Sequence, residues 1–370
     1  VTVSSTSPKM VRKLKSTQPI HRNTKNYFAS RLFPVCIQLM CNVKEDPNWN
    51  TKTTGEDNDD DDEDEKDTTA SDEDVGESAL DRMCQSLGLK STYALVSSQL
   101  LTLFTSGNWK QQHCGLRYLG NYVEVSKNFT EKKQLSQHRK EVLSIVIQFS
   151  SNSNYRVRGA AYYALNQFLI MHGNNILSGS MNNHQSSVEQ QNQLVSVVLP
   201  NVLDALSIKV NPPPRVRRFV MASLINLIDS CIPTSMLEER GPDGVASNGP
   251  NGLTSKILTA VVEALNEGPV LIQEYCVSVI ISLAETVRGK QFVQYYDALM
   301  PILKQLLVYT QQAGLESFWG TVIECIAIVG ESCGKDRFYN DANEMMNHLV
   351  SLSKQVDEDA EIRRYILKAW

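Results

Sequence analysis

The residues with the most distinctive chemistry form an acidic run, EDNDDDDEDE, at positions 56–65. Between Glu45 and Glu77, 16 acidic residues face Lys52 and Lys66, a local charge of −14 that leaves +9 elsewhere against −5 overall. Such a run is either a solvated spacer or an anionic tether for a basic partner. Its carboxylates are Glu56, Asp57, Asp59, Asp60, Asp61, Asp62, Glu63, Asp64 and Glu65.

A second group of acidic, amide and aromatic residues lies on segments with helical periodicity but outside their apolar stripes. An acidic and aromatic helix face suits a basic, extended peptide. We interpret these residues as candidates for such a binding face, on the concave side of a curved stack of helices. An ordinary solvated helix face is the alternative. The candidates are Tyr163, Asn166, Asn226, Asp229, Glu274, Trp319, Glu324 and Glu331.

Catalytic and metal-binding signatures are absent from the sequence. There is no P-loop, GxSxG, HExxH or GxGxxG motif, and the six histidines lack metal-ligand spacing. The eight cysteines contain no CxxC pair and lie mostly within apolar helical patterns, which indicates reduced core residues. We therefore expect a protein that is not an enzyme and has no cofactor and no metal.

The elements that must position these residues repeat along the chain. The stretches NYRVRGAAYYALNQF, PPRVRRFVMASLINL and DAEIRRYILKAW share a small or polar start, then Val-Arg or Ile-Arg, then an apolar face. We align the copies on the residue in the Val or Ile position of this pair, here called the anchor. Successive anchors are spaced by 46, 59, 56, 46 and 44 residues, close to the period of HEAT-type helical hairpins. The two long spacings contain polar inserts, residues 173–193 and 238–255, which we interpret as loops. The anchors are Gln111, Val157, Val216, Ile272, Phe318 and Ile362.

Each anchor opens the second helix of a hairpin, here called helix B, and an apolar helix A precedes it. In one copy an apolar stripe lies at i, i+4, i+7, i+8 and i+11, and Asn108, Asn154 and Asp359 stand at N-cap positions. Prolines inside the A patterns predict bent helices. Stacked hairpins bury a continuous core, so we predict an all-α, right-handed HEAT-repeat α-solenoid. The stripe residues are Val157, Ala161, Ala164, Leu165 and Phe168, and the prolines are Pro34, Pro200 and Pro301.

An arginine follows the anchor in three of the B helices: Arg158, Arg217 and Arg363. The helix dipole disfavours a cation in the first turn, so we expect an acidic or carbonyl partner from a neighbouring repeat to offset it. A solvated arginine is the alternative. Gln112, Gln273 and Trp319 break this inter-repeat ladder elsewhere.

The predicted organisation has three parts. Residues 1–43 hold the end of one repeat and the next A helix, residues 44–76 form an acidic intra-repeat loop, and residues 77–370 continue the repeats to a truncated last one. No stretch of 18 apolar residues and no signal peptide is present, so we expect no membrane insertion. Because the chain lacks an initiator Met and ends in a helical pattern, we expect a fragment.

Four long strings resemble the importin β3 branch of the karyopherin-β (importin-β) nuclear transport receptors. They are GESALDRMCQSLGLK after the acidic loop, NWKQQHCGLRYLG, YYDALMPILKQLL and GTVIECIAIVGESCGKDRFYNDANEMM. The resemblance covers nearly all of residues 1–370 and implies a middle segment of a longer receptor. The acidic loop matches the family's acidic loop in position, whereas the two polar inserts depart from the family pattern.

The resemblance implies a nuclear import receptor. Such receptors bind cargo with basic localisation signals, including ribosomal proteins and histones, and touch phenylalanine-glycine (FG) nucleoporin repeats between A helices. GTP-bound Ran releases the cargo, although the first Ran-binding repeats would lie upstream of this chain. We expect a monomer that shuttles between cytoplasm and nucleus and does not bind nucleic acid directly. A HEAT scaffold subunit, or an acidic-loop chaperone for basic proteins without Ran control, is the alternative.

Overall fold

The computed structural model describes residues 20–46, 49, 71–87, 89–126, 132–177, 184–207, 212–237, 252–287 and 292–353, and every regular element in them is a helix. The contacts divide the chain into two compact units, residues 1–172 and 173–370, and each is described by itself. The acidic run, Asp359 and Arg363 lie outside the described residues.

The first unit is built from hairpins whose second helices also contact one another. Helix α2 packs on α3, α4 packs on α5, and α3 also contacts α5. The stripe predicted for α7 is confirmed, because all five of its residues are buried. The helices are α2 (Ile20–Met40), α3 (Asp72–Leu87), α4 (Leu89–Thr105), α5 (Trp109–Ser126), α6 (Lys132–Ser150) and α7 (Tyr155–Leu177), the last of which ends just inside the second unit.

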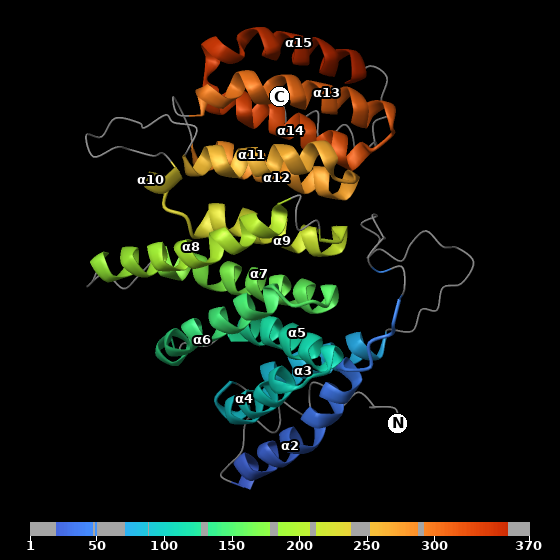
Figure 1. Ribbon diagram of the computed structural model, residues 1–370, viewed down its shortest axis with the longest axis vertical. Helices are drawn as coiled ribbons and strands as arrows, with labels where there is room; N and C mark the ends of the chain where they lie inside the picture. The colour runs from blue at the N-terminus through green and yellow to red at the C-terminus, as the bar shows by residue number, and fades with distance from the viewer. Residues whose placement is uncertain are drawn as a thin grey trace. The chain divides into compact units, whose positions relative to one another are not determined.

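The second unit stacks the hairpins α8/α9, α11/α12 and α13/α14 (Figure 1). Its B helices α9, α12 and α14 pack successively on one another, so α12 lies between two neighbours and about half of its residues are buried. The helices are α8 (His184–Leu206), α9 (Pro214–Ser230), α10 (Thr234–Leu237), α11 (Leu253–Glu267), α12 (Val270–Thr286), α13 (Val293–Gln312), α14 (Glu316–Cys333) and α15 (Lys335–Ser353).

The predicted caps are confirmed where the structure describes them, and the three prolines lie inside helices as expected, while the predicted bends stay a prediction. The Asn108 side chain accepts a hydrogen bond from the Lys110 N–H, and Asn154 accepts one from the Arg156 N–H, both at 2.9 Å. These bonds satisfy donors that the helix itself leaves open. Pro34, Pro200 and Pro301 lie inside α2, α8 and α13.

Two predicted loop regions are partly helical. Helix α3 begins at Asp72, inside the segment expected to be loop, because the Ser71 hydroxyl accepts from the Asp74 N–H at 3.2 Å and donates to its carboxylate at 2.6 Å. Three acidic residues in its first turn favour the positive end of the helix dipole. The insert at 173–193 also contains the end of α7 and the start of α8.

The second insert, residues 238–255, is held together at its ends. The Thr254 hydroxyl, in the first turn of α11, donates to the carbonyl oxygen of Leu237 at 2.8 Å. Thr254 is buried, so this bond also satisfies a polar group removed from water. Residues 238–251 lie outside the described part of the chain.

Candidate protein-binding surface on the B helices

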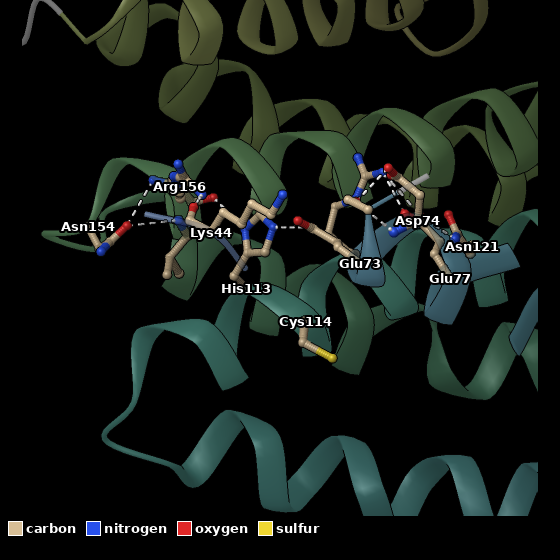
Figure 2. A network of polar contacts seen from close by, with 12 residues as sticks. Lys44, Glu73, Asp74, Glu77, His113, Cys114, Asn121, Asn154 and Arg156 are labelled. Carbon is tan, nitrogen blue, oxygen red and sulfur yellow. Dashed lines mark hydrogen bonds and ion pairs between the residues drawn. The ribbon is translucent and has the colours of Figure 1, made fainter. Parts of the chain in front are cut away.

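A polar ladder joins the B helices of the first unit, α3, α5 and α7 (Figure 2). Glu77 of α3 accepts two hydrogen bonds from the Arg117 guanidinium of α5, at 3.0 and 2.8 Å. Asn121 donates to the same carboxylate at 2.6 Å and accepts the Tyr163 hydroxyl of α7 at 2.7 Å. The Arg117 guanidinium also lies 4.1 Å from the centroid of the Tyr163 ring. These four side chains thus connect three successive B helices.

A second rung of the ladder centres on His113 of α5. Its Nε2 lies 2.8 Å from the Glu73 carboxylate of α3, and its Nδ1 lies 3.1 Å from the Arg156 carbonyl oxygen of α7. The Arg156 guanidinium in turn donates to the Lys44 carbonyl oxygen at 2.8 Å and lies 5.4 Å from the Trp49 ring. The chain that leads into the acidic run is therefore attached to α7.

Charge pairing shifts the titration of the ladder residues. Burial raises the pKa of Glu73, but the hydrogen bond and charge of His113, with Arg117 and Arg156, outweigh it and lower that pKa. Burial lowers the pKa of Arg117, but the nearby Glu77 carboxylate outweighs it and the pKa is raised. The ladder charges are half-buried and mutually neutralised, which is the arrangement that offsets their desolvation.

The B helices of the second unit carry a different carboxylate. Glu274 of α12 is half-buried and forms no ion pair with any residue that the structure describes. Burial alone raises its pKa, which shows that its charged form lacks compensation. A cation brought beside it would remove that penalty. Glu274 is therefore suited to accept a lysine or arginine from outside.

The other candidates of the second unit occupy varied environments. Asp229 accepts a hydrogen bond from Ser282 of α12, Asn226 donates to the Ala222 carbonyl oxygen at 3.0 Å, and Glu331 is exposed. Glu324 is half-buried. Trp319 is only 3% exposed, so its placement on a ligand-facing surface was wrong: the apolar packing around α14 encloses the ring.

The remaining candidates lie as follows. In α7, Tyr163 belongs to the polar ladder, while Asn166, three residues further along that helix, is half-buried. Arg158 stacks at 4.3 Å on the Tyr155 ring of its own helix. Arg217 is 6% exposed; burial lowers its pKa, and Cys276 of α12 and Glu267 at the end of α11 oppose that effect. Arg217 thus faces an adjoining repeat, and the inter-repeat ladder as a whole stays a prediction.

Glu73, Glu77, His113, Arg117 and Asn121 were missed by the sequence reasoning. A signal was present, because these partners are separated by 40 to 44 residues, close to the repeat period. Among the described residues, no cluster of His, Cys, Asp and Glu could hold a metal ion. No helix in the same part of the chain is sufficiently long and apolar to cross a membrane.

Comparison with known proteins matches this fold. The importin repeat family model matches residues 1–94. Importin subunit beta-3 of Saccharomyces cerevisiae is 23% identical over 325 residues, which cover 86% of this chain and 26% of that protein. A probable importin-5 homolog of Dictyostelium discoideum is 32% identical over 74 residues, 20% of this chain and 7% of that protein. The chain thus spans about a quarter of the length of the first relative.

Solved structures of Kap121p share the fold. The chain matches the crystal structure of Kap121p with a TM-score of 0.72 and 21% identity, over 98% of this chain and 30% of that one. Kap121p bound to Pho4p gives 0.73 with 21% identity, over the same shares of the two chains. The all-α architecture is therefore that of a HEAT-repeat α-solenoid. The chain is therefore similar to importins in sequence and to Kap121p in fold, and both similarities agree with the resemblance to karyopherin-β receptors.

Proposed function

We propose that this chain is part of a nuclear import receptor that binds cargo through basic segments laid across its B helices. Glu274 carries the proposal, because a half-buried carboxylate without an ion-pair partner among the described residues is a site that a lysine or arginine would complete. Asp229 and Glu331 supply further negative charge on the flanking B helices α9 and α14. The receptor has no catalytic step, since its work is reversible binding.

The first unit contributes in another way. Its ladder carboxylates Glu73 and Glu77 are already paired with His113 and Arg117, so they position the B helices and do not compete for cargo. Tyr163 stays half-buried beside Arg117 with its hydroxyl bonded to Asn121, and its ring edge can contact a passing peptide. The acidic run at 56–65 adds long-range attraction for a basic partner.

The similarity to importins and to Kap121p supports the remaining steps of the proposed transport, which are passage through the nuclear pore and release of cargo. Structures of Kap121p bound to Pho4p and to Nup53p support cargo and nucleoporin partners for the present chain as well. We propose that the receptor acts as a monomer and moves between cytoplasm and nucleus. It contacts FG nucleoporins through its A helices and releases its cargo when GTP-bound Ran binds to it. Because a solenoid is springlike, two ligands that prefer different curvatures oppose each other's binding.

Release by Ran tests the proposal. A labelled basic segment, such as a ribosomal-protein peptide, is bound to a receptor that includes the repeats upstream of this chain. Ran is then titrated in its GTP and its GDP forms while fluorescence anisotropy reports bound peptide. The import-receptor function predicts release by the GTP form only. Equal behaviour of the two forms contradicts it and leaves a HEAT scaffold or a chaperone.

The acidic run itself favours one alternative, an acidic chaperone for basic proteins. In that case residues 56–65 would provide all of the affinity, whereas in a receptor the B helices provide part of it. Deleting residues 56–65 therefore separates the two functions in the same anisotropy assay. Complete loss of peptide binding supports the chaperone, and partial loss supports the receptor.

A further inference from the structure

His113 of α5 joins two other B helices through the two nitrogens of one ring. Its Nε2 lies 2.8 Å from the Glu73 carboxylate of α3, and its Nδ1 lies 3.1 Å from the Arg156 carbonyl oxygen of α7. Figure 2 shows the ring between these two groups. The His113 and Glu73 side chains are only 12% and 23% exposed, so water competes little for either contact.

Both ring nitrogens of His113 face groups that only accept hydrogen bonds. A backbone carbonyl oxygen carries no proton, and neither does an ionised carboxylate. The Glu73 carboxyl is ionised at neutral pH, because the hydrogen bond and charge of His113, with Arg117 and Arg156, outweigh burial and lower its pKa. A neutral imidazole has one N–H group and could satisfy only one of the two oxygens. The contacts are therefore both satisfied only by an imidazolium ring, in which both nitrogens donate.

The chain that leads into the acidic run is attached beside this histidine. Residues 42–46, here called the strap, follow the C-terminal end of α2. The Arg156 guanidinium of α7 donates to the Lys44 carbonyl oxygen of the strap at 2.8 Å. The Glu45 carboxylate of the strap pairs with Lys110 of α5 at 3.4 Å. Arg156 thus holds the strap with its side chain and accepts from the histidine with its main chain.

We propose that His113 is a pH-dependent clasp that ties α3 to α7, and through Arg156 secures the strap, only while its ring carries two protons. Loss of one proton to solvent leaves a ring-nitrogen lone pair facing an oxygen lone pair, so that contact is repelled and opens. The acidic run lies between the strap and Glu73 in the sequence, so the clasp fixes residues on both sides of it. The clasp is closed where the carboxylate and the ring are both charged, and it opens as the pH rises.

Charged groups from each neighbouring element surround the ring. Glu73 is the carboxylate in direct contact with it, whereas the cations Arg117 and Lys110 are paired with carboxylates of their own. Exchange of protons at the ring therefore changes a single ion pair in an otherwise balanced cluster. The titratable and charged residues around it are Asp72, Glu73, Asp74 and Glu77 of α3, Lys110 and Arg117 of α5, Arg156 of α7, Lys44 and Glu45 of the strap, and Cys41 at the end of α2.

The second unit provides a matched control histidine. His348 of α15 is also half-buried, but its Nε2 has no hydrogen-bond partner among the residues that the structure describes. Substituting His348 removes one titrating ring and leaves every contact of the clasp in place.

The protonation state of the ring tests the proposal on the unsubstituted protein. In a chain that carries isotope-labelled histidine, the NMR shifts of the ring nitrogens distinguish an imidazolium from either neutral tautomer. We expect both nitrogens of His113 to be protonated at neutral pH and to give the signals of a neutral ring at alkaline pH. The signals are identified by their absence from His113→Gln and by their persistence in His348→Gln. A neutral His113 ring at neutral pH would overturn the proposal.

A second variant tests the role of the carboxylate. Glu73→Gln keeps the shape of the side chain but replaces an oxygen by an amide NH₂ group, which can donate to the unprotonated nitrogen of a neutral ring. His113 should therefore be neutral at neutral pH in this variant. A ring that stays doubly protonated would contradict the assignment of Glu73 as the group that requires the second proton.

Hydrogen–deuterium exchange reports whether the clasp secures the strap. Exchange in peptides that contain residues 42–46 is compared between wild type and His113→Gln at the same pH, so the intrinsic pH dependence of exchange cancels. At neutral pH the variant should exchange about tenfold faster, as expected for loss of a hydrogen bond to a charged group. At alkaline pH the two proteins should exchange alike, and His348→Gln should match the wild type throughout.

Equal exchange of wild type and His113→Gln at neutral pH, or a difference that persists unchanged at alkaline pH, would refute the clasp. Neither readout uses a cargo peptide or Ran, so the outcome is independent of the proposed transport function.

Discussion

Neighbouring B helices of the first unit are joined by half-buried ion pairs, whereas those of the second unit are joined by aliphatic packing and single hydroxyls. Glu77–Arg117 represents the first kind. In the second unit, the Ser332 hydroxyl of α14 donates to the Ala284 carbonyl oxygen of α12 at 2.8 Å, amid buried aliphatic side chains. One repeat architecture therefore tolerates two chemistries at equivalent helix contacts. In the first unit the Glu77 carboxylate is paired with Arg117 of the next B helix, whereas in the second unit Glu274 forms no ion pair with a described residue.

Truncating the aliphatic contact of the second unit gives the largest expected effect. Leu283 of α12 is 0% exposed, so Leu283→Ala should lower the free energy of unfolding by about 3 kcal/mol through lost burial and a cavity. Urea unfolding measured at low and high salt checks both size and character. The loss should be the same at both salt concentrations. A marked salt dependence would contradict the claim that aliphatic packing joins the B helices of the second unit.

Breaking the ion pair of the first unit should have a slightly smaller effect. Glu77→Gln leaves the half-buried Arg117 guanidinium without its carboxylate, and the free energy of unfolding should fall by about 2 kcal/mol. Urea unfolding gives the value. Glu263→Gln, at an exposed carboxylate of α11, is the control and should be silent.

A double-substitution cycle sharpens the same prediction. In Glu77→Gln with Arg117→Met, both charges are gone, so the loss should be smaller than the sum of the single losses. Additive losses would show that the two side chains do not interact.

The change in stability on acidification should have opposite signs for a carboxylate of the first unit and one of the second. The folded pKa of Glu73 lies below its ordinary value of 4.5, so its contribution is present above that pH and is lost as pH falls through the folded pKa. Over this pH range the free energy of unfolding of the wild type should fall by about 1 kcal/mol through Glu73, and this fall should be absent in Glu73→Gln.

Glu274 has the opposite shift, because its folded pKa is raised. Its ionisation therefore destabilises the fold as pH rises above 4.5, and Glu274→Gln should not reduce stability at pH 7. Urea midpoints measured across acidic and neutral pH check both variants. The same sign of pH dependence for both carboxylates would refute the contrast.

The smallest effect is expected where ion pairs of the second unit are partly exposed. Lys304 of α13 pairs with Asp341 of α15 at 2.5 Å, and Tyr296 also donates to Asp341. Asp341→Asn should lower the free energy of unfolding by less than about 1 kcal/mol, and the loss should shrink at high salt. Thermal unfolding at two salt concentrations checks this, and a loss as large as that of Glu77→Gln would contradict it.

The sequence allowed the hairpins to be predicted because caps, prolines and apolar stripes are local signals. Asn108, Asn154 and Pro301 lie where they were expected. The extension of α3 to Asp72 was missed because an acidic segment favours a loop prediction, although Ser71 and Asp74 have the spacing of a capping pair.

The polar ladder was harder to predict. A pair such as Glu77 and Arg117 forms only when two helices from different repeats meet in one register, and a single-helix pattern carries no such register. Trp319 was misplaced for a related reason, because a rotation of one position on a helix decides between the core and the surface. Glu274, by contrast, is half-buried, and its assignment to a ligand-facing surface stays a prediction.

The most direct test of the account is peptide binding at Glu274. Isothermal titration calorimetry of a lysine- and arginine-rich peptide is compared between wild type, Glu274→Gln and the exposed control Glu263→Gln. Glu274→Gln should bind the peptide about tenfold more weakly, equivalent to about 1.4 kcal/mol, and the control should bind it as the wild type does. Equal affinity in all three proteins would contradict the assignment of the B helices of the second unit as a surface for basic partners.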